Sequence, residues 1–175
     1  SLRSHGVRKD LKTKNSNGCS WYYEMHDLGF NYRITDFQCA LGFNQLKKLN
    51  KFLKRRREIA EIYNSKFKNK SFITVPKINK NCKHAFHLYP LRINFDQLGI
   101  SKKKLFKKLN KKKINLQVHY IPIHLQPFYK KKLGFKEGDF PVAEKFYKDE
   151  VSLPIYFSLQ NKQVNNTIKY LTQMI

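Results

Sequence analysis

A long helix is the strongest feature in the pattern of apolar and polar positions. From Thr35 onward, apolar residues recur mostly at steps of three and four, the spacing of one helix face. These residues are Phe37, Leu41, Leu49, Phe52, Leu53, Ile59, Ala60, Tyr63 and Phe67. The side-chain oxygen of Thr35 or Asp36 can cap the first turn by accepting a hydrogen bond from a free backbone N–H. A helix over residues 35–67 is about 50 Å long, so we expect either a kink near Gly42 or a helix that bridges two domains.

Shorter elements follow this helix. Alternation predicts strands over 71–76, 85–95 and 114–122, and a brief extended piece over 152–155. Helices are predicted over 101–112, capped by Ser101, over 126–134, over 141–151 with Pro141 at the first position, and over 160–174. This order predicts an α/β protein whose later part is a small α+β layer, a short sheet covered by helices.

The first 28 residues show no periodic pattern. Aromatic residues nevertheless occur near the end of this segment and just after it. Trp21, Tyr22, Tyr23 and Phe30 have no helix or strand of their own in which to be buried. We therefore expect this segment to pack against a larger surface.

Size and charge narrow the functional classes. The chain has 175 residues and a mass of 21.0 kDa, and 41% of its residues are hydrophobic, which suits one folded domain. Lys and Arg number 36 against 12 Asp and Glu, a net charge of +24 that attracts polyanions. The excess is mostly Lys in clusters at 102–104, 111–113 and 130–132, beside abundant Asn and Ile. No stacking or base-reading motif accompanies it, so we favour compositional drift on solvated faces over nucleic-acid binding.

Cysteine use and hydropathy indicate the compartment. Cys19, Cys39 and Cys82 have no paired spacing, which is typical of a reducing environment. No apolar run approaches the roughly 20 residues of a membrane span, and the N-terminus does not resemble a signal peptide. We expect a cytoplasmic protein.

The residues by themselves show no catalytic group and no metal site. His84 and His87 fall on opposite faces of the predicted strand, and His119 and His124 flank Pro122 with no Cys or carboxylate at ligand spacing. There is no Ser or Cys nucleophile motif and no glycine-rich phosphate loop.

A polar and aromatic cluster, Asn31-Tyr32-Arg33, directly precedes the long helix. Free backbone N–H groups at a helix start attract a phosphate, and Arg33 adds a forked pair of donors for an anion. The alternative is that Asn31 only turns the chain and Arg33 forms a local salt bridge. The residues alone leave both open.

Four segments identify a family. They are "RSHG" at 3–6, "GFNYRITDFQCALGFNQLKKLNKFLKRRREIAEIY" at 29–63, "HLYPLRI" at 87–93, and "VHYIPIHLQPFYKKKLGFKEGDFPVAEKFYKDEVSLPIY" at 118–156. Together they resemble the C-terminal half of the DegT/DnrJ/EryC1/StrS sugar aminotransferases over nearly all of the chain. The combination of "WYYEM", "LGFNYR" and "VHYIPIHLQPFY" resembles most the branch that acts in pseudaminic acid biosynthesis on a UDP-linked 4-keto-6-deoxy sugar.

The resemblance implies a fold type I enzyme that uses pyridoxal 5′-phosphate (PLP) and glutamate as amino donor, built as a homodimer with its active sites at the subunit interface. It implies that Asn31 binds the cofactor phosphate of the neighbouring subunit and that Tyr32 and Arg33 line the nucleotide-sugar site. It also implies that His119 and Tyr120 contribute to the substrate pocket. Phe128 and Tyr129 either form the wall of this pocket or fill the core.

The family's Schiff-base Lys, its Asp at the pyridine nitrogen, its stacking aromatic and a phosphate-binding Ser all precede the "RSHG" segment, so we expect them upstream of Ser1. No lysine of this chain has the context of the catalytic one, and transamination needs that amine. We therefore expect a C-terminal fragment, inactive alone, in which residues 1–40 end the large PLP-binding domain and residues 41–175 form the small domain with the bridging helix. A non-catalytic or dehydratase relative, and a basic nucleic-acid-binding module, remain alternatives.

Overall fold

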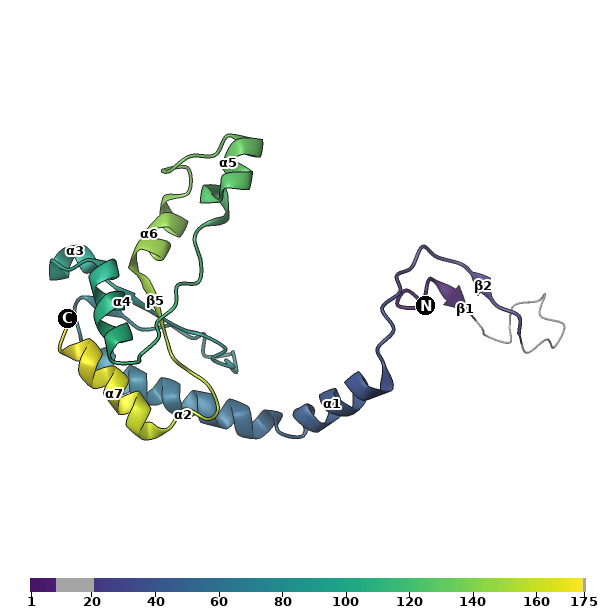
Figure 1. Ribbon diagram of the computed structural model, residues 1–175, viewed down its shortest axis with the longest axis horizontal. Coiled ribbons are helices and arrows are strands. Elements are labelled where there is room, and N and C mark those ends of the chain that lie inside the picture. The colour runs from purple at the N-terminus through teal and green to yellow at the C-terminus, as the bar shows by residue number, and fades with distance from the viewer. Residues whose placement is uncertain (9–20, 175) are drawn as a thin grey trace. The chain divides into compact units, whose positions relative to one another are not determined.

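The computed structural model describes residues 1–8 and 21–174, which belong to two compact units, Ser1–Lys48 and Leu49–Ile175 (Figure 1). Cys19 lies outside the described residues. The assignment of residues 1–40 to a large cofactor domain and of 41–175 to a small domain remains a prediction.

The first unit is a small antiparallel ladder followed by one helix. Strand β1 (Val7–Arg8) pairs with β2 (Glu24–Met25), and helix α1 (Asp36–Leu46) follows. The predicted cap at Thr35 is confirmed. Thr35 Oγ1 accepts a hydrogen bond from Gln38 N at 3.3 Å, and Gln38 Oε1 accepts one from Thr35 N at 3.0 Å, a capping box.

The long helix is interrupted, but not at the predicted place. Helix α1 ends at Leu46 and α2 (Leu49–Phe67) begins three residues later. At the break, Lys48 N donates to Gln45 O at 3.0 Å, an i→i−3 bond that tightens the turn and ends the α-helical ladder. The prediction of a kink near Gly42 is therefore wrong, because Gly42 lies within α1.

The second unit contains a three-stranded antiparallel sheet in the order β3-β4-β5. The strands are β3 (Ile73–Thr74), β4 (Tyr89–Ile93) and β5 (Glu150–Leu153). Tyr89 pairs with Leu153, and Ile73 pairs with Ile93. Burial alternates along β4, with Tyr89, Leu91 and Ile93 buried on one face.

All three predicted strands are shorter in the structure, and the one predicted over 71–76 is reduced to β3. Residues 84–88 are not in a strand, because Phe86 has a φ of 48° and its N–H donates to His84 Nδ1 at 3.0 Å, which turns the chain. The argument that placed His84 and His87 on opposite faces of a strand is therefore wrong. Segment 114–122 contributes only a single bridge between Gln117 and Ser152.

The predicted helices of the second unit are present. They are α4 (Lys102–Lys111), α5 (Pro127–Leu133), α6 (Pro141–Asp149) and α7 (Asn161–Thr172). A short helix α3 (Phe95–Leu98) precedes α4, and a 3₁₀ turn at Ile123–Leu125 lies between α4 and α5. Ser101 caps α4 through a hydrogen bond from Lys104 N at 3.2 Å, and Pro141 starts α6, as predicted. Glu150 and Val151, predicted to end α6, instead begin β5.

The core of the second unit lies between the sheet and helices α2, α4 and α7, and Figure 1 shows α7 beside α2. Its fully buried side chains include Ile59, Tyr63, Phe67, Tyr89, Leu91, Ile93, Leu105, Leu109, Val151, Val164 and Leu171. Burial raises the pKa of the Tyr63 and Tyr89 hydroxyls above the ordinary tyrosine value. The unit is thus an α/β arrangement, a small sheet covered by helices.

Three consecutive arginines of α2 bind backbone carbonyls. Arg56 Nη1 donates to the carbonyls of Phe86, His87 and Ile155, each at 3.0 Å. Arg57 Nε donates to His84 O at 3.0 Å, and Arg55 Nη2 donates to Leu159 O at 2.5 Å. These guanidinium groups therefore fasten α2 to loops of the second unit.

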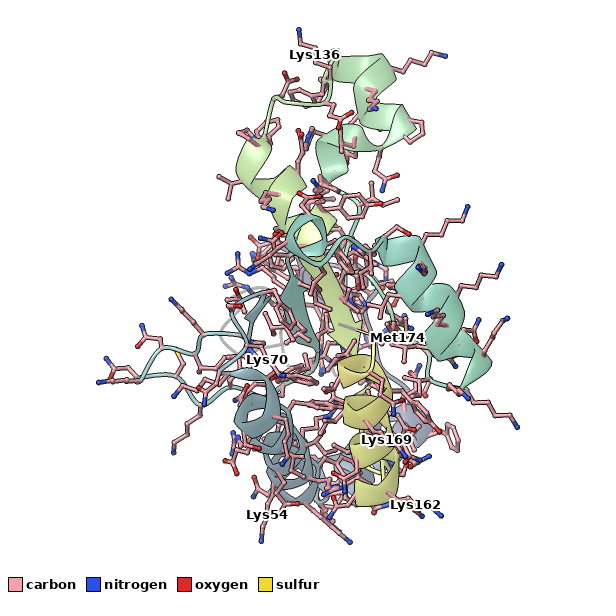
Figure 2. The ribbon with its side chains drawn as sticks, turned by 90° about the vertical axis from the view of Figure 1, so that its left-hand side faces the viewer. Lys54, Lys70, Lys136, Lys162, Lys169 and Met174 are labelled. Carbon is pink, nitrogen blue, oxygen red and sulfur yellow. The ribbon has the colours of Figure 1, made fainter. Side chains whose placement is uncertain are left out.

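The lysines are spread around the second unit. Figure 2 shows Lys54, Lys136 and Lys162 at widely separated places, each pointing away from the ribbon. Such a distribution favours solvated faces over a single polyanion-binding surface. Within the described residues, no helix is long and apolar enough to cross a membrane.

Candidate functional site

Two glycines shape the loop that carries Asn31. A Cβ on Gly6, which has a φ of +70°, would lie 1.8 Å from Asp27 O, and a Cβ on Gly29 would lie 2.2 Å from Gly6 N. This close approach brings the "RSHG" segment against the chain before α1. Ser4 then forms a bridge with Asn31, and Tyr32 N donates to Arg3 O at 2.8 Å. Asn31 is thereby held by its backbone just before the start of α1.

The side chains of Asn31 and Arg33 form a set of hydrogen-bond donors. Arg33 Nε donates to Asn31 Oδ1 at 3.2 Å, which uses one of the two lone pairs of the amide oxygen. Within residues 1–8 and 21–174, the Asn31 amide nitrogen and the terminal nitrogens of Arg33 make no hydrogen bond, and Arg33 forms no ion pair. These nitrogens can only donate, and in the sequence they precede the start of α1. Such a set suits a phosphate.

Tyr32 lies between these two donors in the sequence and stacks on Phe30. The ring centroids are 4.9 Å apart, the planes differ by 9°, and Tyr32 is 71% exposed. A flat, exposed aromatic surface therefore lies beside the donor set.

His119 and Tyr120 lie at a pocket of the second unit with a volume of about 650 Å³. The pocket is lined from β5 by Ser152, from α7 by Gln163 and Asn166, and at its rim by Lys112 and Lys113. The His119 and Tyr120 rings meet edge to face with centroids 4.7 Å apart. Both predicted residues therefore belong to one polar pocket.

A fully buried carboxylate lies beside His119. Glu150 has no exposed surface. Its Oε2 accepts a hydrogen bond from the backbone N–H of His119 at 2.9 Å, and its Oε1 accepts one from Ser152 Oγ at 2.5 Å. Ser152 Oγ lies 2.8 Å from His119 Nδ1. No pattern in the sequence singles out Glu150 or Ser152; the only signal is that polar and apolar residues alternate over Glu150–Leu153.

His124 has a different role from that of His119. It is 7% exposed, and its Nε2 lies 2.8 Å from Glu144 Oε1. The hydrogen bond from His124, with those from the backbone N–H groups of Gly138 and Phe140, lowers the pKa of Glu144 below its ordinary value. The pair therefore joins the two ends of the α5–α6 segment rather than facing the pocket that His119 lines.

Phe128 and Tyr129 are not brought to the pocket within the second unit. They lie on α5, which buries none of its residues, and are 62% and 38% exposed. Their rings meet edge to face with centroids 5.2 Å apart. The alternative that they fill the core is wrong for the described chain, because both lie at its surface. A role as the wall of a substrate site remains a prediction.

In the part of the chain that the structure describes, no three His, Cys, Asp or Glu side chains lie close enough together to hold a metal ion.

Sequence comparison matches the chain to a family and to longer relatives. The model of the DegT/DnrJ/EryC1/StrS aminotransferase family matches residues 1–172. The uncharacterized protein MJ1066 of Methanocaldococcus jannaschii is 45% identical over 174 residues, 99% of this chain and 45% of that protein. The UDP-4-amino-4,6-dideoxy-N-acetyl-beta-L-altrosamine transaminase of Campylobacter jejuni is 40% identical over 161 residues, 92% of this chain and 40% of that protein. The chain therefore spans less than half the length of these relatives.

Solved structures give the same result for the fold. Helicobacter pylori PseC, an aminotransferase involved in the biosynthesis of pseudoaminic acid, matches with a TM-score of 0.79 and 30% identity, over 99% of this chain and 44% of that one. The PMP form of a putative sugar aminotransferase, Spr1654 from Streptococcus pneumoniae, matches with a TM-score of 0.81 and 30% identity, over 99% of this chain and 43% of that one. These matches confirm the predicted fold class and the predicted resemblance.

Proposed function

Because the chain belongs to the DegT/DnrJ/EryC1/StrS aminotransferase family, we propose that it is part of a PLP-dependent nucleotide-sugar aminotransferase. The proposed reaction transfers an amino group from glutamate to C4 of a UDP-linked 4-keto-6-deoxy amino sugar. The observation that carries the proposal is the family match over residues 1–172, which includes the loop where Asn31 and Arg33 form a donor set. The names of the Campylobacter and Helicobacter relatives support the sugar class.

The donor set fits the phosphate of PLP. With its amide oxygen bonded to Arg33, Asn31 has amide N–H groups available to donate to an anion, and a phosphate dianion offers acceptors. In the proposal, Asn31 binds the cofactor phosphate of the neighbouring subunit in a homodimer. When bound, PLP supplies the electron sink through which amino groups are exchanged. The contribution of this chain is to hold the phosphate and orient the sugar.

The remaining site residues surround the sugar nucleotide. Tyr32 and Arg33 line the nucleotide side, where a stacked ring and a guanidinium suit a base and a diphosphate. His119 and Tyr120 contribute the polar pocket against β5. Phe128 and Tyr129, exposed on α5, form part of the wall once the rest of the enzyme is in place.

The proposal assigns the covalent Lys to a part of the enzyme outside these 175 residues, so the chain alone does not transaminate. The proposal also requires that another protein surface covers the apolar residues of the first unit. Trp21, Phe37 and Leu46 are 74%, 79% and 65% exposed. Large exposed apolar side chains in such number mark a surface that another protein surface covers. The free thiols of Cys39 and Cys82 agree with the proposed cytoplasmic location.

The test uses the longer polypeptide that the proposal requires, read from the genomic DNA on either side of this sequence. We expect it to bind PLP and to release 2-oxoglutarate from glutamate when given a UDP-linked 4-keto-6-deoxy sugar. If the longer polypeptide binds PLP but only eliminates water from the sugar, or carries no Lys in the family's context, the chain belongs to a dehydratase or non-catalytic relative instead.

A further inference from the structure

The pocket that His119 lines is supported by a chain of hydrogen bonds from β5. The bridge between Gln117 and Ser152 sets an antiparallel register that places His119 opposite Glu150. In β5, side chains two residues apart share a face, so Glu150 and Ser152 both lie toward His119. One strand thus offers His119 a carboxylate and a hydroxyl at once.

Glu150 is buried beside two hydrogen-bond donors. It accepts the His119 backbone N–H at 2.9 Å and the Ser152 hydroxyl at 2.5 Å. Both oxygens of this buried carboxylate therefore have a partner, as buried polar groups require.

The Ser152 hydroxyl has one proton, and this fact determines the state of His119. If the proton is donated to the Glu150 carboxylate, Ser152 Oγ can only accept from the His119 side. At 2.8 Å, His119 Nδ1 must then carry the hydrogen. A neutral imidazole with its hydrogen on Nδ1 has a bare lone pair on Nε2. Among the described residues, none forms a hydrogen bond with His119 Nε2.

We propose that the pocket of about 650 Å³ against β5 is a ligand site in which His119 Nε2 is the hydrogen-bond acceptor, and that Glu150 and Ser152 are positioning residues that fix this tautomer. A bare imidazole nitrogen recognises a group that donates a hydrogen bond, either a hydroxyl of a sugar or the ammonium of an amino acid. The proposal has two halves. The ligand half, which concerns what the pocket binds, rests on the proposed function, whereas the tautomer half, which concerns the hydrogen position on His119, does not.

The tautomer is measured directly on the 175-residue chain labelled with ¹⁵N-histidine. Two-bond ¹H–¹⁵N spectra distinguish a protonated ring nitrogen from a bare one, and the His119 signals are assigned by their loss in His119→Asn. We expect Nδ1 to be protonated and Nε2 bare near neutral pH. Hydrogen on Nε2 in the unaltered chain overturns the proposal, because Nε2 could then donate but not accept a hydrogen bond. This measurement needs no variant of Glu150 or Ser152 to fold.

Two variants then separate positioning from packing. Ser152→Ala removes the acceptor for Nδ1–H, so we expect His119 to shift toward the Nε2–H form that free histidine side chains prefer. Ser152→Thr keeps the hydroxyl, and we expect it to restore the Nδ1–H form. An unchanged tautomer in a folded Ser152→Ala chain overturns the positioning role.

The ligand half is tested with two probes, UDP-N-acetylglucosamine and L-glutamate, added separately at millimolar concentration. We expect one of them to move the Nε2 resonance of His119 upfield, as accepting a hydrogen bond does. A shift by the nucleotide sugar assigns a hydroxyl, and a shift by glutamate assigns an ammonium. If neither probe moves it, the ligand half is wrong, whereas PLP binding by the longer polypeptide tests the proposed function independently.

Discussion

The two units of the chain differ in how far they bury their own apolar residues. In the second unit, α2, α4, α7 and the sheet enclose a core in which Tyr63, Leu91 and Leu109 have no exposed surface. In the first unit, α1 buries none of its residues although its sequence includes Phe37, Leu41 and Phe43. The second unit buries its apolar side chains in a core of its own. The apolar side chains of α1 in the first unit stay exposed.

This difference explains where the proposed chemistry lies. The pocket at His119 is built entirely from the second unit and is complete in its hydrogen bonding with β5. The loop of the first unit holds the donor set at Asn31. Among the described residues, the amide nitrogen of Asn31 and the terminal nitrogens of Arg33 have no hydrogen-bond partner. We infer that the first unit contributes to a site whose other half belongs to a different surface.

The largest predicted effect is the loss of stability when a buried leucine of the second unit is truncated. An exposed leucine of the first unit is the comparison. Leu91→Ala in β4, where Leu91 is fully buried, is expected to lower the free energy of unfolding by about 2–5 kcal/mol, because it leaves a cavity. Leu41→Ala in α1, where Leu41 is 54% exposed, is expected to change it by less than about 0.5 kcal/mol. Guanidinium denaturation followed by circular dichroism measures both. Equal losses would show that α1 is packed in solution after all.

A smaller loss of stability is expected when an arginine of the second unit is replaced. Arg56→Ala frees three carbonyls that Arg56 Nη1 binds and is expected to cost about 2 kcal/mol of stability, since hydrogen bonds to charged groups are strong. Arg56→Lys should recover little of it, because an ammonium lacks the planar fork.

The matched control for this arginine is Arg33→Ala. Among the described residues, its guanidinium binds only the exposed Asn31 amide, so the change is expected to be below about 0.5 kcal/mol. The same denaturation measurement applies, and a loss at Arg33 as large as that at Arg56 contradicts the assignment of Arg33 to ligand binding.

The smallest effect concerns the His124–Glu144 pair of the second unit. The pKa of Glu144 is lowered in the folded chain, first by the hydrogen bond from His124. Its contribution to stability is therefore present above the ordinary glutamate value of 4.5 and is lost as pH falls through the lowered pKa. We expect Glu144→Gln to be less stable than the parent at neutral pH, with the difference shrinking in acid.

Thermal unfolding at a series of pH values measures the effect of Glu144→Gln. Glu24→Gln, in the half-buried His26–Glu24 pair of the first unit, is the control and should leave the unfolding of the second unit unchanged. A pH-independent difference for Glu144→Gln would rule out the titration as its cause.

Elements with a local chemical signal were predictable from the sequence. Thr35 and Ser101 have side-chain oxygens that cap helices, and Pro141 fits a first turn, so these starts lie where predicted. The prediction of a strand over 114–122 was wrong for a reason that lies outside this segment. His119 N donates to the Glu150 carboxylate rather than to a neighbouring strand, and no local pattern reveals that.

Charge was the least informative part of the sequence. Arg55, Arg56 and Arg57 form a run that suits nucleic acid in isolation, yet each binds carbonyls of distant segments. The buried Glu150 was missed for the same reason, because its compensating donors are His119 and Ser152. Buried polar networks depend on the tertiary fold and have no periodicity.

The most direct test of the central claim is the PLP affinity of the longer polypeptide with Asn31→Ala, compared with Asn44→Ala. Asn44 is an exposed asparagine of α1 whose amide nitrogen donates to Ala40 O at 3.0 Å, its one side-chain hydrogen bond within residues 1–8 and 21–174. Losing a hydrogen bond to a charged phosphate costs about 1.5–3 kcal/mol, so Asn31→Ala should weaken PLP binding roughly tenfold to a hundredfold, and Asn44→Ala should not. Equal affinity in both variants and the parent would contradict the claim that Asn31 holds the cofactor phosphate.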